Sequence, residues 1–205
     1  MKALAVLGAG GHGGVVKDVA ELVGWERITF FDDNKINDGP SGLMNLTNFD
    51  ALIESRAEFD AAFVAIGDNK IRLSKIRVLM SLNVKVAILI HPSAVISRTA
   101  RLKEGTLIGA NCVVQNDVSI GVGSIVNTNA TVEHDVVIGD GVHISPSACV
   151  CGSAHISNLA WVGANAVVAP SVVVGPGVVI GAGAALMGNV DPNRVVIGVP
   201  AKERR

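Results

Sequence analysis

The chain has 205 residues and a formal net charge of −1; 49% of its residues are hydrophobic, 3% are aromatic, and 23 are glycines. This balance excludes a general electrostatic attraction to nucleic acid, and no apolar stretch approaches the length that spans a membrane. Three cysteines without a CxxC motif form no even disulfide framework, so we expect a cytoplasmic protein. Cys112 is predicted to be a buried thiol, and Cys149 and Cys151 to be packing residues.

The first 89 residues alternate apolar strands with amphipathic helices. We expect strands at 2–8, 27–31, 60–66 and 85–90, helices at about 15–23, 47–55 and 73–80, and a loop over 34–46. Strands that alternate with helices predict a parallel sheet with helices on its faces. We therefore predict a small Rossmann-like α/β domain over residues 1–89, too short for a two-halved dinucleotide fold.

A glycine-rich turn follows the first predicted strand. Gly8, Gly10 and Gly13 satisfy GxGxxG within a predicted turn over 8–14, and Asp32 stands at the end of the second strand. Glycines of this kind let backbone N–H groups approach a phosphate at a helix N-terminus. A dinucleotide such as NAD and a tight turn without a ligand are both compatible with the motif. A nucleotide diphosphate joined to something other than a second nucleoside fits the short domain better.

The second half of the chain is built on a period of six. From Ile90 to Leu186 every sixth residue is aliphatic, without an insertion, and the residue four places later is small or β-branched. Hexapeptide repeats are typical of a parallel β-helix, in which three hexads close one coil and residue i stacks on residue i+18. We expect between five and six coils over residues 90–190, followed by a tail over 191–205. A β-sandwich would need loops of varying length.

The most polar run of the repeat, residues 127–135, contains His134 between Glu133 and Asp135. His134 lies two residues past an aliphatic position, which predicts a place at a corner. A neutral imidazole with a carboxylate partner is the commonest general base, although a solvated corner histidine is also compatible with the pattern. His134, His143 and His155 are not separated by multiples of 18, which disfavours a zinc site within one chain and leaves open a site between chains.

These features together resemble the sialic-acid O-acetyltransferase and nucleotide-sugar N-acetyltransferase family, which includes the bacillosamine-pathway acetyltransferase. The resemblance covers essentially the whole chain. It is carried by the segments GAGGHG (8–13), FDD (31–33), AIGDN (65–69), VEHD (132–135), VHIS (142–145) and GVPAK (198–202). It implies a left-handed β-helix and a homotrimer with active sites between chains. It further implies acetyl-CoA as co-substrate, a UDP-sugar bound by the N-terminal domain, and no metal.

The resemblance also assigns roles to individual residues. His134 corresponds to the catalytic base and Asp135 to its acidic neighbour, which is Glu in the bacillosamine-type pattern. The residues implied to bind the diphosphate and sugar are Gly10, Gly11 and His12; those implied to bind uridine are Asp32 and Asp33, with Gly67 as a further substrate contact. Acetyl-CoA is expected to contact His143, Ala164 and Ala182, with a contribution from the tail over 191–205.

We therefore expect an acetyltransferase that moves acetyl from acetyl-CoA to the amino group of a UDP-linked 4-amino-deoxysugar. Acetylation of a sugar hydroxyl by the same base is the close alternative. A zinc hydratase and a non-catalytic solenoid that binds a nucleotide sugar are the alternatives from other classes.

Overall fold

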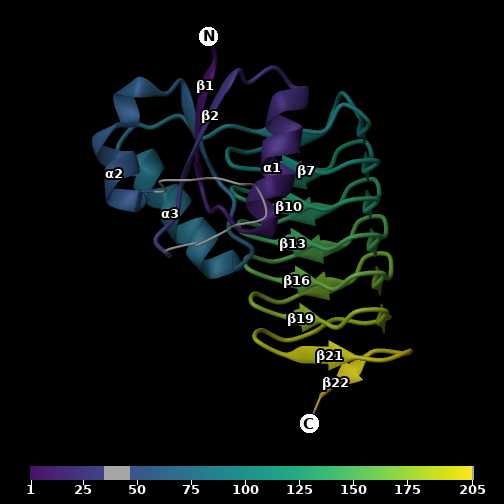
Figure 1. Cartoon of the computed structure of the whole chain (residues 1–205). Coiled ribbons are helices and arrows are strands. Elements are labelled where there is room, and N and C mark those ends of the chain that lie inside the picture. Colours follow the sequence, from purple (N-terminus) through teal and green to yellow (C-terminus); the bar gives the residue numbers. More distant parts are fainter. Residues whose placement is uncertain (35–46, 205) are drawn as a thin grey trace. The chain divides into compact units, whose positions relative to one another are not determined.

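The computed structural model describes residues 1–34 and 47–204, and the chain divides into two compact units, Met1–Leu89 and Ile90–Arg205 (Figure 1). Among the helices in these ranges, none is both long enough and apolar enough to cross a membrane.

The first unit contains a three-stranded parallel sheet in the order β2-β1-β3. Its central strand β1 (Ala3–Leu7) pairs with β2 (Arg27–Phe31) on one side and with β3 (Ala61–Val64) on the other. Every residue of β1 and β3 is buried, as expected for strands that helices cover on both faces. Because β2 and β3 lie on opposite sides of β1, the strand order reverses at the carboxyl end of β1, where ligands bind in open α/β sheets.

The helices of this unit are α1 (Gly11–Leu22), α2 (Phe49–Glu54), the short 3-10 helix η1 (Arg56–Glu58) and α3 (Asn69–Ser81). Asn48 caps α2 by accepting from a backbone N–H, and Asp68 caps α3 in the same way. Gly10 precedes α1 and has no side chain with which to cap it. The first N–H groups of α1 therefore receive no side-chain partner from the N-cap residue.

Two predicted boundaries in this half are wrong. The turn is shorter than 8–14, because α1 already begins at Gly11, and Gly13 packs so closely that a Cβ there would collide with the Gly8 carbonyl oxygen. The fourth strand over 85–90 is also not continuous. Val86 makes only an isolated bridge to Ala62, and the chain then enters the repeat. Apart from Asn34, the predicted loop over 34–46 lies outside the described residues.

The second unit is a parallel β-helix of about six turns, formed by three sheets of very short strands (Figure 1). The eight-stranded sheet contains β4 (Leu89–Ile90), β7 (Leu107–Ile108), β10 (Ile125–Val126), β13 (His143–Ile144), β16 (Trp161–Val162), β19 (Val179–Ile180), β21 (Val195–Ile197) and β22 (Lys202–Glu203). The six-stranded sheet contains β5 (Val95–Ile96), β8 (Val113–Val114), β11 (Thr131–Val132), β14 (Cys149–Val150), β17 (Val167–Val168) and β20 (Ala185–Leu186). The five-stranded sheet contains β6 (Arg101–Leu102), β9 (Ser119–Ile120), β12 (Val137–Ile138), β15 (His155–Ile156) and β18 (Val173–Val174).

The strand register confirms the predicted stacking of residue i on residue i+18. Ile125 pairs with His143, and His143 pairs with Trp161 in the next coil. The aliphatic residue of each hexad points inward, and Ile144, Val150 and Ile156, which follow one another around one coil, are fully buried. Burial of each such side chain contributes about 1.5–3 kcal/mol relative to exposure, so every turn of the repeat adds its own share of core.

The corners have a recurrent backbone conformation. Asn, Asp or Ser occupies most of the corner positions with positive φ; Asp117 and Asp135 each have φ 59°. These short polar residues adopt the left-handed region more readily than other non-glycine residues do. The strict hexad spacing therefore reflects a corner of constant length.

Candidate active site

The side chains of His134 and Asp135 meet at a corner of the β-helix, between β11 and β12. His134 Nδ1 lies 2.8 Å from Asp135 Oδ2, and both side chains are more than half exposed. A carboxylate oxygen can only accept, so Nδ1 carries the proton and the neutral ring keeps its lone pair on Nε2. The predicted corner position of His134 is confirmed, and in this tautomer Nε2 is the ring nitrogen that can accept a hydrogen bond.

Gly152 lies directly against this imidazole, one coil further along the chain. A Cβ at Gly152 would be 2.6 Å from His134 Cε1 and 2.7 Å from Nε2. The edge of the ring that carries Nε2 therefore faces backbone that only glycine leaves open. Within residues 1–34 and 47–204, the Gly152 N–H has no hydrogen-bond acceptor. The corner thus combines a basic nitrogen with a backbone donor.

His143 lies elsewhere, on β13 in the eight-stranded sheet, and its ring contacts two other side chains. Asn127 Nδ2 is 3.2 Å from His143 Nε2. The Trp161 ring stacks on the imidazole with a centroid distance of 5.8 Å and an interplanar angle of 2°. His143 and the His134–Asp135 pair thus belong to different parts of the coil.

Ala164 and Ala182 occupy equivalent corners of successive coils, after β16 and β19. Gly183 N–H donates to the Ala164 carbonyl oxygen at 2.8 Å, which ties the two corners together. In the described part of the chain, neither the Ala164 N–H nor the Ala182 N–H has an acceptor. Two unpaired backbone donors therefore follow the strands that come after His143 in this sheet.

The first unit has a cleft of about 330 Å³ at the carboxyl ends of its strands. Residues lining it include Gly10, Asp32, Asp33, Ile66 and Lys75. One Asp32 oxygen accepts from the Ala9 N–H and the other from the Asn34 N–H, each at 2.8 Å. The carboxylate therefore has a fixed orientation at the end of β2, next to the uncapped start of α1.

Asp33 is held by a second set of contacts. It accepts from the Phe49 N–H at 2.8 Å and from Lys75 Nζ at 2.9 Å, and Lys75 also lies 4.0 Å from the centroid of the Phe49 ring. The backbone hydrogen bond, followed by the bond from Lys75, lowers the pKa of Asp33. The cleft therefore presents an ionised carboxylate with a cation beside it.

Two basic side chains of the first unit, Arg72 and His12, are buried. The Arg72 guanidinium is fully buried and donates to the carbonyl oxygens of Ile66 and Gly67, each at 3.0 Å. Burial lowers the pKa of Arg72 to about 10. Burial, followed by the charge of Arg72, lowers the pKa of His12 to about 4, and His12 Nε2 is buried without a hydrogen-bond partner. His12 is therefore neutral at neutral pH.

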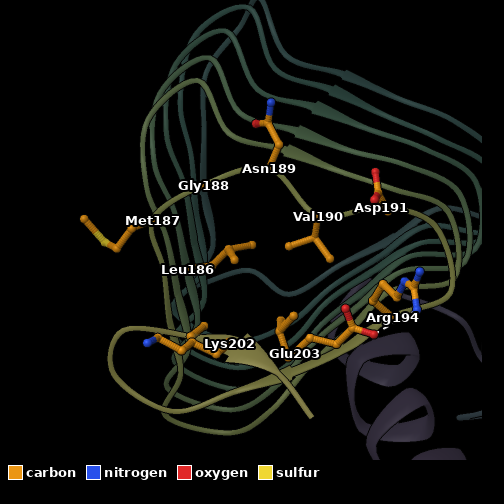
Figure 2. Close-up of a pocket in the computed structure, with 11 residues that line it drawn as sticks. Leu186, Met187, Gly188, Asn189, Val190, Asp191, Arg194, Lys202 and Glu203 are labelled. Carbon is orange, nitrogen blue, oxygen red and sulfur yellow. Dashed lines mark hydrogen bonds and ion pairs between the residues drawn. The ribbon is translucent and has the colours of Figure 1, made fainter. Parts of the chain in front are cut away.

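The C-terminal end of the β-helix contains a cavity of about 260 Å³ (Figure 2). Leu186 and Val190 line its apolar part, and Arg194, Lys202 and Glu203 line its polar part (Figure 2). Arg194 Nη1 pairs with Glu203 at 2.8 Å, next to the short antiparallel pairing of β21 and β22. The tail over 191–204 thus forms one wall of this cavity.

The cysteines and other possible metal ligands form no metal site within the described ranges. No group of three His, Cys, Asp or Glu side chains there is close enough to hold a metal ion. Cys112 is fully buried, as predicted, and burial raises the pKa of its thiol to about 11. Burial and the neighbouring Cys151 raise the pKa of Cys149 to about 11 as well, so both thiols stay protonated at neutral pH.

Sequence reasoning did not identify Lys75, Gly152 or Trp161. Lys75 meets Asp33 across 42 positions, and no local pattern shows this contact. The repeat did contain a signal for Gly152, because position 152 is 18 residues after His134. The same stacking places position 161 after position 143, so that pair of aromatic rings could have been found.

Comparisons with known proteins agree with this architecture. The family described as "PglD N-terminal domain" matches residues 3–79, and "Bacterial transferase hexapeptide (six repeats)" matches residues 153–188. The acetyltransferase domain of PglB from Neisseria gonorrhoeae FA1090, solved with acetyl coenzyme A, is 36% identical with a TM-score of 0.94, and the match covers 99% of this chain and 99% of that chain.

Two further structures match over the full length of the chain. A histidine-to-asparagine mutant of perosamine N-acetyltransferase from Caulobacter crescentus, solved with CoA and GDP-perosamine, is 30% identical with a TM-score of 0.94 and covers 100% of this chain and 98% of that one. WeeI from Acinetobacter baumannii AYE is 25% identical with a TM-score of 0.88 and covers 100% of both. The resemblance inferred from the sequence is confirmed, and the chain belongs to the hexapeptide-repeat family of sugar N-acetyltransferases that carry a PglD-type N-terminal domain.

Proposed function

We propose that this protein transfers acetyl from acetyl-CoA to the amino group of a nucleotide-linked amino sugar, with His134 as general base. The observation that carries the proposal is the His134–Asp135 pair at 2.8 Å, with the Nε2 edge of the ring against Gly152. The relatives solved with acetyl-CoA, or with CoA and GDP-perosamine, support the two substrate classes. For this chain we propose UDP as the nucleotide and a 4-amino-deoxysugar as the acceptor.

The proposed reaction is a direct transfer through a tetrahedral intermediate. The neutral amine attacks the thioester carbonyl carbon, a C–N bond forms, and His134 Nε2 removes the proton that the nitrogen must lose. Asp135 stabilises the imidazolium that results. The C–S bond then breaks, and the same proton passes to the sulfur, so that CoA leaves as the thiol. General-base assistance of this kind contributes about 10²–10⁴ in rate.

The Gly152 N–H is our candidate for the oxyanion donor. It has no acceptor in the described part of the chain, and Gly152 itself packs against the ring edge that carries Nε2. A preorganised backbone donor aimed at developing negative charge contributes about 2.7–4 kcal/mol to the stabilisation of the transition state. The donor would then bind the carbonyl oxygen of the thioester, and the base would remove the proton from the attacking nitrogen.

We assign acetyl-CoA to the second unit, along the corners that follow the eight-stranded sheet. His143 would contact the thioester end, and the unpaired N–H groups of Ala164 and Ala182 would bind carbonyl oxygens of the pantetheine arm. The tail over 191–205 would contribute to CoA binding, and Lys202 at the C-terminal cavity supplies a cation for its phosphates.

The cleft of the first unit is the proposed nucleotide-sugar site. The diphosphate would bind at the uncapped start of α1, formed by Gly10, Gly11 and His12. Asp32 and Asp33 would bind uridine, and Gly67 would make a further substrate contact. This assignment is supported by the cleft, by the fixed carboxylates and by the glycines at the switch point of the sheet.

The separation of His134 from His143 leads us to propose a homotrimer with active sites between chains. Closed cyclic assemblies are the usual form of oligomers, and a neighbouring chain could bring its His143 opposite His134. The outward column of the six-stranded sheet includes Val95 and Val167, which are 65% and 40% exposed and would be covered in such an assembly. The three cysteines are free, which suits a reducing compartment, and we place the enzyme in the cytoplasm.

The test is a screen by thermal shift and by CoA release. UDP-4-amino sugars are compared with GDP- and dTDP-linked amino sugars, and with a UDP-sugar that carries a hydroxyl in place of the amine. We expect acetyl transfer to an amino sugar and none to the hydroxyl analogue. Efficient acetylation of the hydroxyl would identify an O-acetyltransferase, and activity that depends on zinc with no CoA released would identify a hydratase.

A further inference from the structure

The His143 and Trp161 rings are each hydrogen-bonded to a polar residue that lies one coil earlier. Asn127 Nδ2 meets His143 Nε2 at 3.2 Å, and Trp161 Nε1 donates to Ser145 Oγ at 2.7 Å. Each polar residue lies 16 positions before its ring, so both bonds run along the same diagonal between adjacent strands. This shared diagonal accounts for the parallel stack, in which the two ring planes are 2° from parallel.

The orientation of the Asn127 amide follows from its other contact. Asn127 Oδ1 accepts from the Thr128 backbone N–H at 2.8 Å. A backbone N–H can only donate, so this contact identifies the oxygen end of an amide whose two ends are otherwise hard to distinguish. The NH₂ end must then face His143 Nε2.

This orientation determines the tautomer of His143. The NH₂ group of Asn127 can only donate, so Nε2 must accept, and the proton of the neutral ring lies on Nδ1. Protonation of Nε2 would place two N–H groups against each other, so the contact favours the neutral ring. His134 has the complementary arrangement, since Asp135 holds its Nδ1–H and leaves Nε2 as an acceptor.

We propose that Asn127 is a positioning residue for acetyl transfer, which holds His143 neutral with its proton on Nδ1. Ser145 and Trp161 fix the plane of the same ring. The inference rests on the proposed function in taking His143 as a contact of the thioester end of acetyl-CoA. In this tautomer His143 serves as a hydrogen-bond donor toward a thioester oxygen, and His134 alone serves as the base. The two histidines thus divide the roles of donor and acceptor.

The direct test is ¹⁵N NMR of the full-length protein labelled at histidine, with the His143 signals assigned by their loss in His143→Gln. We expect the wild-type spectrum to show Nδ1–H and a non-protonated Nε2 at the pH of the assay. A wild-type His143 that carries its proton on Nε2, or on both nitrogens, would overturn the proposal without use of any Asn127 variant.

Asn127→Asp extends the test to activity. The carboxylate can still accept from Thr128, but it cannot donate to His143, so it should move the proton to Nε2 and lower kcat by one to two orders of magnitude. The KM for the nucleotide sugar should not change. Asn127→Ala, which removes the donor without adding a charge, should give mixed tautomers and a smaller loss of kcat.

Trp161→Phe is the matched control, because it keeps a stacked ring and removes only the bond to Ser145. Its His143 tautomer should remain that of the wild type. A His143 ring that keeps its proton on Nδ1 in the Asn127→Asp variant would contradict the positioning role of Asn127. A tautomer that switches with no change in kcat would contradict the assignment of His143 to the transfer step. The proposed acetyl transfer with His134 as general base would not be affected by that result.

Discussion

Replacement of Gly152 by alanine tests whether the exact position of the His134 ring matters for catalysis. The new Cβ would lie 2.6 Å from His134 Cε1 and 2.7 Å from Nε2, whereas carbon atoms in contact are separated by about 3.5–4.0 Å. The imidazole must therefore move by about 1 Å. Gly152 does not have a positive φ, so its backbone conformation accepts alanine and the coil should fold normally.

A displacement of this size should reduce kcat about 100-fold, which corresponds to about 2.7 kcal/mol of transition-state stabilisation. The assay follows release of the CoA thiol at saturating substrates, and the melting temperature is measured in parallel. Ser153→Ala is the control, because it changes an exposed residue of the same corner without placing an atom against the ring. A Gly152→Ala protein with full kcat and an unchanged melting temperature would refute the reasoning.

Three further predictions concern the nucleotide, pH and assembly. Asp32→Ala should raise the KM for the nucleotide sugar and leave the KM for acetyl-CoA unchanged, since it frees the Ala9 N–H at the cleft; tight binding of NAD with none of UDP would favour a dinucleotide site instead. Because burial lowers the pKa of His12 from 6.5 to about 4, only the unfolded chain takes up this proton between these pH values. The free energy of unfolding should therefore fall by about 3 kcal/mol as pH drops from 6.5 to 4, and urea titrations of His12→Gln should lack this fall; equal slopes would contradict it. Mixed trimers of His134→Ala and His143→Ala chains should recover part of the activity, and mixed trimers that form without recovery would exclude a site shared between chains.

The repeat could be predicted from sequence because every coil consists of three hexads with the same spacing of aliphatic residues. Each hexad places one aliphatic residue inside, and most corners carry Asn, Asp, Ser or Gly at the same offset, so the register leaves few alternatives. The contact of His134 with Asp135 was also predictable, because the two residues are adjacent at a corner. Stacking by 18 residues contained further information, and applied to His134 it indicates Gly152 as its neighbour.

The remaining features depend on contacts that no periodicity describes. Lys75 reaches Asp33 from α3, and the pairing depends on how that helix packs on the sheet. Residues 85–90 have the composition of a strand, but Val86 makes a single bridge before the chain adopts the register of the repeat at Ile90. The connection to the repeat therefore outweighs the local preference of these residues for a continuous strand.

The measurement that tests the central claim most directly is the turnover of His134→Ala with acetyl-CoA and a UDP-4-amino sugar, together with calorimetric binding of both substrates. If His134 Nε2 removes the proton of the attacking amine, kcat should fall by two orders of magnitude or more. The dissociation constants should stay close to those of the wild type. A variant that binds both substrates and keeps about a third of the wild-type kcat would lack the loss expected for a general base, and would remove His134 from the mechanism.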